Sequence, residues 1–125
     1  MKKLGLLTVA LIAVVLTGCD PQCCPETTVK AYYKALQEQD FSTSASYILM
    51  QPGDSQKEMT EALKTVYSKD GAIVSFDVFG SAKTTNDVAE VAVATEIAKA
   101  PKGYDTKGVS TLNLVKSNGK WYIKF

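Results

Sequence analysis

The sequence predicts an α+β domain in which N-terminal helices pack on one face of a curved, four-stranded antiparallel sheet. Two observations support this fold class. Between residues 25 and 67 the apolar residues recur with the helical period of about 3.6. After Gly71 they alternate with polar residues, which is typical of strands with one buried face. A run of helices followed by a run of strands favours a sheet that is covered by helices on one side.

Three helices are expected in the first half of the chain. Pro25 suits the first turn of a helix that ends near Gln39, and its apolar stripe comprises Val29, Tyr32, Tyr33 and Leu36. Asp40 suits the N-cap of a short second helix, whose inward residues would be Phe41, Ala45, Ile48 and Leu49. Ser55 and Glu58 form a capping box for a third helix, whose apolar stripe comprises Met59, Leu63, Val66 and Tyr67.

Four strands are expected after these helices. In the first strand the residues facing the core would be Val74, Phe76 and Val78. In the second, buried residues would alternate with Glu90, Ala92, Ala94 and Glu96. The third would bury Leu112 and Leu114. Asn118-Gly119 is a preferred type I′ hairpin turn, and the fourth strand after it would turn one face inward, formed by Trp121, Ile123 and Phe125. We expect Trp121 to pack between the sheet and the first or third helix.

The first 18 residues are expected to be a signal peptide that is not part of the fold. Lys2 and Lys3 precede an uncharged apolar run at residues 4–16. This run is too short to cross a bilayer core, which takes about 20 apolar residues. It fits the apolar region of a secretory signal peptide, and a buried core helix is the less favoured alternative.

The residues that end this run, Leu16-Thr17-Gly18-Cys19, resemble the lipobox of bacterial lipoproteins. The resemblance implies cleavage between Gly18 and Cys19 and a diacylglycerol thioether on Cys19. Several acyl chains anchor a protein firmly, because each buried CH₂ contributes about 0.8 kcal/mol. We therefore expect a signal peptide at 1–18, a lipidated tether at 19–25 and the α+β domain at 26–125.

The resemblance also implies a location. The mature protein would be held on the outer side of the bacterial cell membrane by its lipid. By analogy with enteric Gram-negative lipoproteins, Asp20 directly after the lipidated cysteine implies the periplasmic side of the inner membrane.

Composition limits the chemistry that the chain can perform. The formal charge is +1, so no basic surface indicates nucleic-acid binding. There is no histidine, which removes the usual general base and the commonest metal ligand. We therefore expect no catalytic activity, no metal site and no cofactor.

Cys23 and Cys24 lie between two prolines in the expected tether. A redox or metal site is one interpretation, although no further cysteine or histidine is present to complete a metal site. We favour a structural role, in which the adjacent thiols form a strained vicinal bond, pair between molecules or carry extra acyl groups.

Two segments resemble a known superfamily. "ETTVKAYYKALQEQDFSTSASYI" and "NGKWYIKF" are similar to the opening helices and the closing strand of cystatin-like and nuclear-transport-factor-2-like proteins. The group that resembles the chain most is a set of bacterial lipoproteins with a domain of unknown function, related to proposed lumazine-binding domains. The resemblance implies a cone between sheet and helices, where enzymes of this superfamily place carboxylates or histidines.

The candidate site residues follow from this cone. Asp77 is the one carboxylate in the first strand and could act as a base if it were buried. The favoured alternative is that Asp77 faces solvent, and Glu90 and Glu96 are expected to be solvated in the same way. Five aromatic residues line a pocket or, as we favour, belong to the core: Tyr32, Tyr33, Tyr47, Tyr67 and Trp121.

The predicted function is that of a membrane-anchored envelope lipoprotein with a non-catalytic binding domain. Its ligand would be small and apolar or aromatic. The alternative is a module for protein–protein interaction in the cell envelope, which would use an exposed sheet face or edge.

Overall fold

The computed structural model describes residues 20–125, apart from the side chains of residues 81, 83 and 84. The predicted signal peptide and Cys19, the predicted lipidation site, therefore lie outside the described residues. The elements, in chain order, are η1 (Pro21–Cys23), α2 (Pro25–Gln37), α3 (Phe41–Ala45), α4 (Gln56–Tyr67), η2 (Lys69–Gly71), β1 (Ile73–Thr85), β2 (Val88–Ile97), β3 (Lys107–Ser117) and β4 (Lys120–Lys124).

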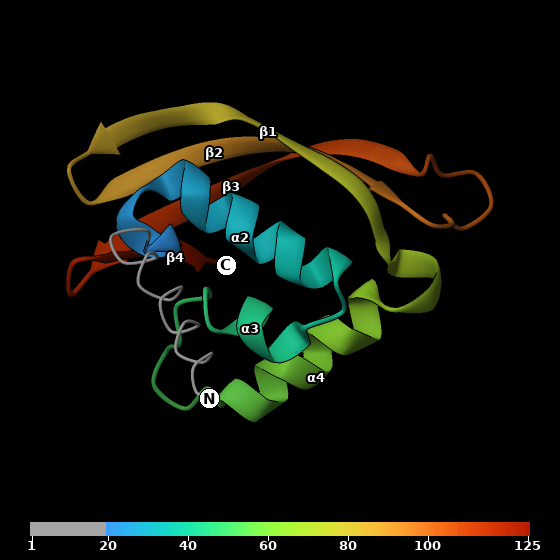
Figure 1. Cartoon of the computed structure of the whole chain (residues 1–125), viewed down its shortest axis with the longest axis horizontal. Coiled ribbons are helices and arrows are strands. Elements are labelled where there is room, and N and C mark those ends of the chain that lie inside the picture. The colour runs from blue at the N-terminus through green and yellow to red at the C-terminus, as the bar shows by residue number, and fades with distance from the viewer. Residues whose placement is uncertain (1–19) are drawn as a thin grey trace, which may run out of the picture.

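The four strands form one antiparallel sheet in the order β1-β2-β3-β4. The sheet curves over α2, and α3 and α4 lie beyond α2 on the same side (Figure 1). The predicted α+β fold class is confirmed. The turn at Asn118-Gly119 also forms, and both residues have the positive φ values, 53° and 80°, that a type I′ turn requires.

The core lies between α2 and the inner face of the sheet. The stripe predicted for the first helix is buried along its whole length, from Val29 to Leu36. It meets inward side chains of the three strands that follow β1, namely Val91, Val93, Leu112, Leu114, Trp121 and Ile123. Strict alternation along β2 and the C-terminal half of β3 sends every second side chain into this core.

Several predicted orientations were wrong. Val74 is 50% exposed, because the pairing with β2 shifts between Ile73 and Ser75 and leaves Ile73 as the inward residue. Phe125 is 72% exposed, since the pairing of β4 with β3 ends at Lys124. Val66 is also exposed: α4 packs on α3, and only the narrow line of Met59, Leu63 and Tyr67 faces inward.

The second helix is shorter than predicted. α3 ends at Ala45, and Ile48 reaches the core as an isolated parallel bridge to Ile123 on the edge strand β4. Two backbone hydrogen bonds form this bridge, from Leu49 N to Ile123 O and from Ile123 N to Tyr47 O, both at 2.8 Å. The bridge covers part of an edge that would otherwise be free to pair with another chain.

Residues before α2 also pack on the domain, although they were expected to form a tether. η1 contacts α2 and β4, and Asp20 caps it by accepting a hydrogen bond from Gln22 N. The Gln22 side chain is buried and donates from Nε2 to Trp121 O at 3.0 Å.

Candidate functional site

Three of the predicted tyrosines and one phenylalanine meet in the space between sheet and helices. Tyr32 and Tyr33 extend from α2, with their rings edge to face and 5.0 Å between centroids. Tyr33 also stacks on Phe76 of β1 at 5.8 Å. Tyr67 comes from the C-terminal end of α4, where Gln39 Nε2 donates to its carbonyl at 3.1 Å. These four residues are called the tyrosine cluster below.

The hydroxyl of Tyr32 is the unusual atom of the tyrosine cluster. Its residue is 1% exposed, and no group among the described residues gives this oxygen a well-formed hydrogen bond. Burial raises the pKa of Tyr32 strongly, with smaller contributions from Tyr67 and Tyr33. Burial also raises the pKa of Tyr33 and, less strongly, of Tyr67. The cluster therefore keeps its phenols neutral at ordinary pH and does not supply a phenolate base.

The remaining two aromatic candidates lie elsewhere. Tyr47 follows α3 and is half-buried; burial raises its pKa, with smaller effects from Asp20 and Asp40. Trp121 is 4% exposed in β4 and belongs to the core. The structure thus unites Tyr32, Tyr33 and Tyr67 but not all five residues.

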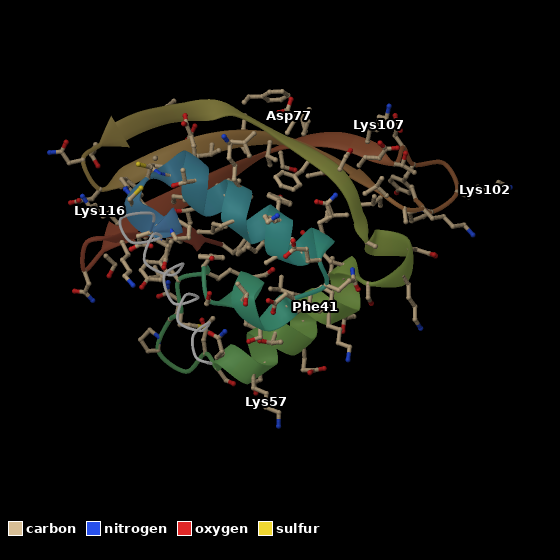
Figure 2. All side chains as sticks on the ribbon, in the orientation of Figure 1. Phe41, Lys57, Asp77, Lys102, Lys107 and Lys116 are labelled. Carbon is tan, nitrogen blue, oxygen red and sulfur yellow. The ribbon has the colours of Figure 1, made fainter. Side chains whose placement is uncertain are left out.

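Open space is found on the other face of the sheet. A hollow of about 560 Å³ lies over β1, β2 and the start of β3. Its lining comprises three rows of paired residues: Ser75, Glu96 and Lys107; then Phe76, Thr95 and Gly108; then Asp77, Ala94 and Val109. We call this the outer-face hollow. The small residue Ala94 lines it from β2, the middle of the three strands. Asp77 and Lys107, which also line it, lie on the side of the sheet away from the helices (Figure 2).

A second hollow of about 370 Å³ adjoins the first along β2. Its lining includes Ala92 and the exposed ring of Phe79, which is 60% accessible. The sequence predicted an exposed sheet face only as a surface for a protein partner. A small-molecule hollow there was missed because the outer carboxylates were interpreted as solvated. The available signal was the choice of alanine at 92 and 94, the smallest side chains at outer positions of the central strand.

Asp77 is exposed on this outer face. Of the two alternatives predicted for Asp77, the solvent-facing one is therefore correct, and Asp77 is not a base inside the cone. Glu90 is exposed as well, and Glu96 is half-buried beside Lys107. The three carboxylates border the two hollows and do not enter the tyrosine cluster.

The adjacent cysteines are exposed thiols, neither of which forms a disulfide with any residue that the structure describes. Their sulfur atoms are 3.2 Å apart, and the hydrogen bond from Cys23 is the largest cause that raises the pKa of Cys24. A raised pKa lowers the thiolate fraction, which disfavours an activated nucleophile. Over residues 20–125 no cluster of three or more metal-ligating side chains is found.

Over the same described range, none of the helices combines the length and the apolar character needed to span a membrane.

Comparison with known proteins gives matches in structure alone. No protein-family model matches the chain, and neither does any curated protein. A protein from Campylobacter jejuni described as a candidate NTF2-like transpeptidase matches with a TM-score of 0.55 and 19% identity, over 81% of this chain and 97% of that one. An NTF2-like protein of unknown function from Shewanella oneidensis matches with a TM-score of 0.58 and 17% identity, over 77% and 88% of the two chains.

A third match corrects a prediction. A ketosteroid isomerase-like protein from Erwinia carotovora has a TM-score of 0.56 and 22% identity, over 79% of this chain and 88% of that one. We expected no catalytic activity because histidine is missing. That prediction was wrong, since proteins of this fold include ones described as a transpeptidase and as ketosteroid isomerase-like, so the fold can be enzymatic. The chain has the NTF2-like fold that these structures share.

Proposed function

We propose that the protein is a membrane-anchored envelope lipoprotein whose domain binds a small apolar or aromatic ligand in the outer-face hollow. The lipobox at residues 16–19 supports the anchor. The volume of the hollow supports the ligand: about 560 Å³ lies within the range of about 300–1,000 Å³ that small-molecule sites occupy.

The lining of the hollow indicates the kind of ligand. Ala94 and Val109 offer apolar surface, and Val109 is 69% exposed. Lys107 of β3 lines the hollow beside Glu96 of β2, and Asp77 lines it from β1. A flat apolar body would rest on the alanine and valine, and a charged group on that body would meet the rim. An aromatic acid or amine of modest size fits this pattern.

Titration with 8-anilinonaphthalene-1-sulfonate, an aromatic sulfonate, tests the ligand half of the proposal. We expect saturable binding to the native protein. Ala94→Trp should weaken it at least about tenfold, the effect of losing about 1.4 kcal/mol, because the indole fills the centre of the hollow. Thr65→Trp on the exposed face of α4 is the matched control. Equal binding by the two variants would rule out the hollow as the site.

Metabolic labelling with a palmitate analogue tests the anchor half. Wild-type protein should carry the label, and Cys19→Ala should not, because that change removes the only thiol in the lipobox. An unlabelled wild type would end the lipoprotein proposal.

A second function is favoured by one observation. Phe79 and Val109 are both exposed on the outer face. Together they expose more apolar surface than a small ligand in one hollow would cover. Large exposed apolar residues on one sheet face are typical of a protein-binding surface. Phe79→Asp distinguishes the two functions. It should abolish capture of an envelope protein by in-cell cross-linking but leave binding of the aromatic sulfonate unchanged within about twofold, because Phe79 lines only the second hollow.

A further inference from the structure

The segment between the predicted lipidation site and α2 forms hydrogen bonds both to β4 and to the first turn of α2. Gln22 inserts its amide into the domain and donates to Trp121 O at 3.0 Å, while its own backbone N–H donates to Asp20 Oδ1 at 2.9 Å. Cys23 N donates to Asp20 O at 3.1 Å. Residues 20–24 thus form a folded turn with a buried side chain at its centre.

The first turn of α2 holds the same segment. The hydroxyls of Thr27 and Thr28 lie 2.7 Å and 3.1 Å from Pro21 O, and Thr28 is fully buried. Pro21 and Pro25 fix their φ angles and so reduce the freedom that ordering the segment would remove. A Gly/Ser-rich spacer would have none of these restraints. Residues 20–24 are called the clip below.

We propose that the clip holds the domain in one orientation on the lipid surface, with the β1–β2 and β3–β4 turns facing the headgroups. The inference rests on the proposed lipidation of Cys19. Consecutive Cα atoms are about 3.8 Å apart, so a lipid on Cys19 would be joined to the clip within one peptide unit. The occupant of this surface is the membrane itself.

Contacts of the clip identify the end of the sheet that faces the lipid. Gln22 meets Trp121 shortly after the Asn118-Gly119 turn, and Lys116 N donates to Asp87 O in the β1–β2 turn at 2.8 Å. Both turns therefore lie at the clip's end of the sheet. Lys116 lies at that end and Lys107 and Lys102 at the other (Figure 2). Strand β3 rises about 3.3 Å per residue, so Lys107 stands about 30 Å from Lys116 along the strand. The outer-face hollow, which Lys107 lines, would then stand clear of the membrane.

Photo-crosslinking to lipid in the full-length, lipidated protein tests this orientation. A benzoylphenylalanine is placed at Lys120, beside the β3–β4 turn, or at Lys102, in the loop at the far end; both positions are exposed. Crosslinks to radiolabelled lipid should be at least about fivefold more abundant from position 120, because the two ends of the sheet are separated by about 30 Å. Gln37→Ala should keep this ratio. It removes another glutamine-to-carbonyl bond, the exposed one from Nε2 to Val74 O at 2.7 Å, outside the clip.

Two variants release the domain in different ways. Gln22→Ala combined with Thr28→Val removes bonds of the clip. An Asp-Gly-Ser-Gly-Ser insert after Cys19 leaves the clip intact but separates it from the lipid. The insert keeps the domain folded and an aspartate next to the lipidated residue, and in both variants the crosslinking ratio should fall toward one.

The outcomes separate the two proposals. A ratio near one in wild-type protein that carries the palmitate label would overturn the fixed orientation and leave the lipoprotein proposal standing. Wild-type protein without the label would overturn the lipoprotein proposal, and the orientation with it.

Discussion

The two faces of the sheet differ although they alternate along the same strands. On β2, Val91 and Val93 are fully buried in the core, while Ala92 and Ala94, which alternate with them, face the opposite side and line two hollows. The inward side chains of β2 at these positions are large and have no solvent exposure. On the outer face, the alanines of β2 leave space between larger exposed side chains such as Phe79 and Val109. Substitutions on the inner face should therefore change stability, and those on the outer face should change binding.

The largest expected effect comes from Trp121 on the inner face. Trp121→Ala removes a buried ring and should lower the free energy of unfolding by about 3–5 kcal/mol. Tyr122 lies on the opposite face of the same strand and is half-buried. Tyr122→Ala should therefore lower the free energy of unfolding much less. Urea unfolding, followed by circular dichroism on a chain that begins at Asp20, measures both. Equal losses would contradict the division between the faces.

Alkaline pH should destabilise the inner face next most strongly. Tyr32 and Tyr33 have pKa values that burial raises above the ordinary value of 10.0. Above pH 10 the unfolded chain loses these protons and the folded chain keeps them. The stabilising contribution of the two phenols is therefore fully present below pH 10 and is lost as the pH rises above 10. Each residue lowers the free energy of unfolding by about 1.4 kcal/mol per pH unit there.

Unfolding curves between pH 9 and pH 11 measure this slope. The double variant Tyr32→Phe, Tyr33→Phe should show a shallower fall with pH. Tyr104→Phe, which changes a ring that is 75% exposed, is the control and should follow the wild type. A double variant that loses stability with pH as steeply as the wild type would refute the assignment to these two residues.

A smaller effect is expected from Tyr32→Phe alone at neutral pH. Among the described residues this buried hydroxyl has no well-formed hydrogen bond, because its interaction with the Tyr67 side chain is poor in geometry. A poorly satisfied buried hydroxyl costs about 1–3 kcal/mol of desolvation. Removing it should leave the free energy of unfolding unchanged or raise it by about 1 kcal/mol. A clear loss of stability would contradict this expectation and show that the oxygen has a stabilising partner, such as the Tyr67 side chain or a water.

The smallest change is expected from Asp77→Asn on the outer face. Asp77 is exposed, so its replacement should alter the free energy of unfolding by no more than about 0.5 kcal/mol. Its effect should instead appear in the binding of a charged aromatic probe, because Asp77 borders the outer-face hollow. A large loss of stability without a change in binding would reverse the roles of the two faces.

The sequence predicted those parts of the fold that depend on local chemistry. The alternation along β2, the stripe of α2 and the Asn118-Gly119 turn each follow from residues that lie close together in the chain. The exposure of Val74 could not be predicted, since it arises from a pairing shift that involves Ile97 and Glu96 of a different strand. Pairing offsets of this kind are fixed by the assembled sheet, not by the strand itself.

The candidate site was less predictable than the fold. The spacing of Tyr32 and Tyr33 placed them on one helix face. The stacking of Tyr33 on Phe76, however, depends on the position of α2 along β1, which the spacing does not determine. The clip was missed because residues 20–24 lie between a predicted lipidation site and Pro25 and contain no apolar run, which is typical of a spacer. One of its bonds joins the Gln22 amide to a carbonyl 99 positions away, a contact that the local sequence does not indicate.

The short strand β4 contacts segments of the chain that are synthesised long before it. Its backbone receives Gln22 from the segment before α2 and pairs with Tyr47 and Leu49 after α3. Contacts between residues so distant in sequence slow folding, because a long loop must close before they form. During synthesis, the early helices can form but cannot be locked in place until β4 has emerged. The domain should therefore remain open to proteases and chaperones until that moment, and then close in a single cooperative step.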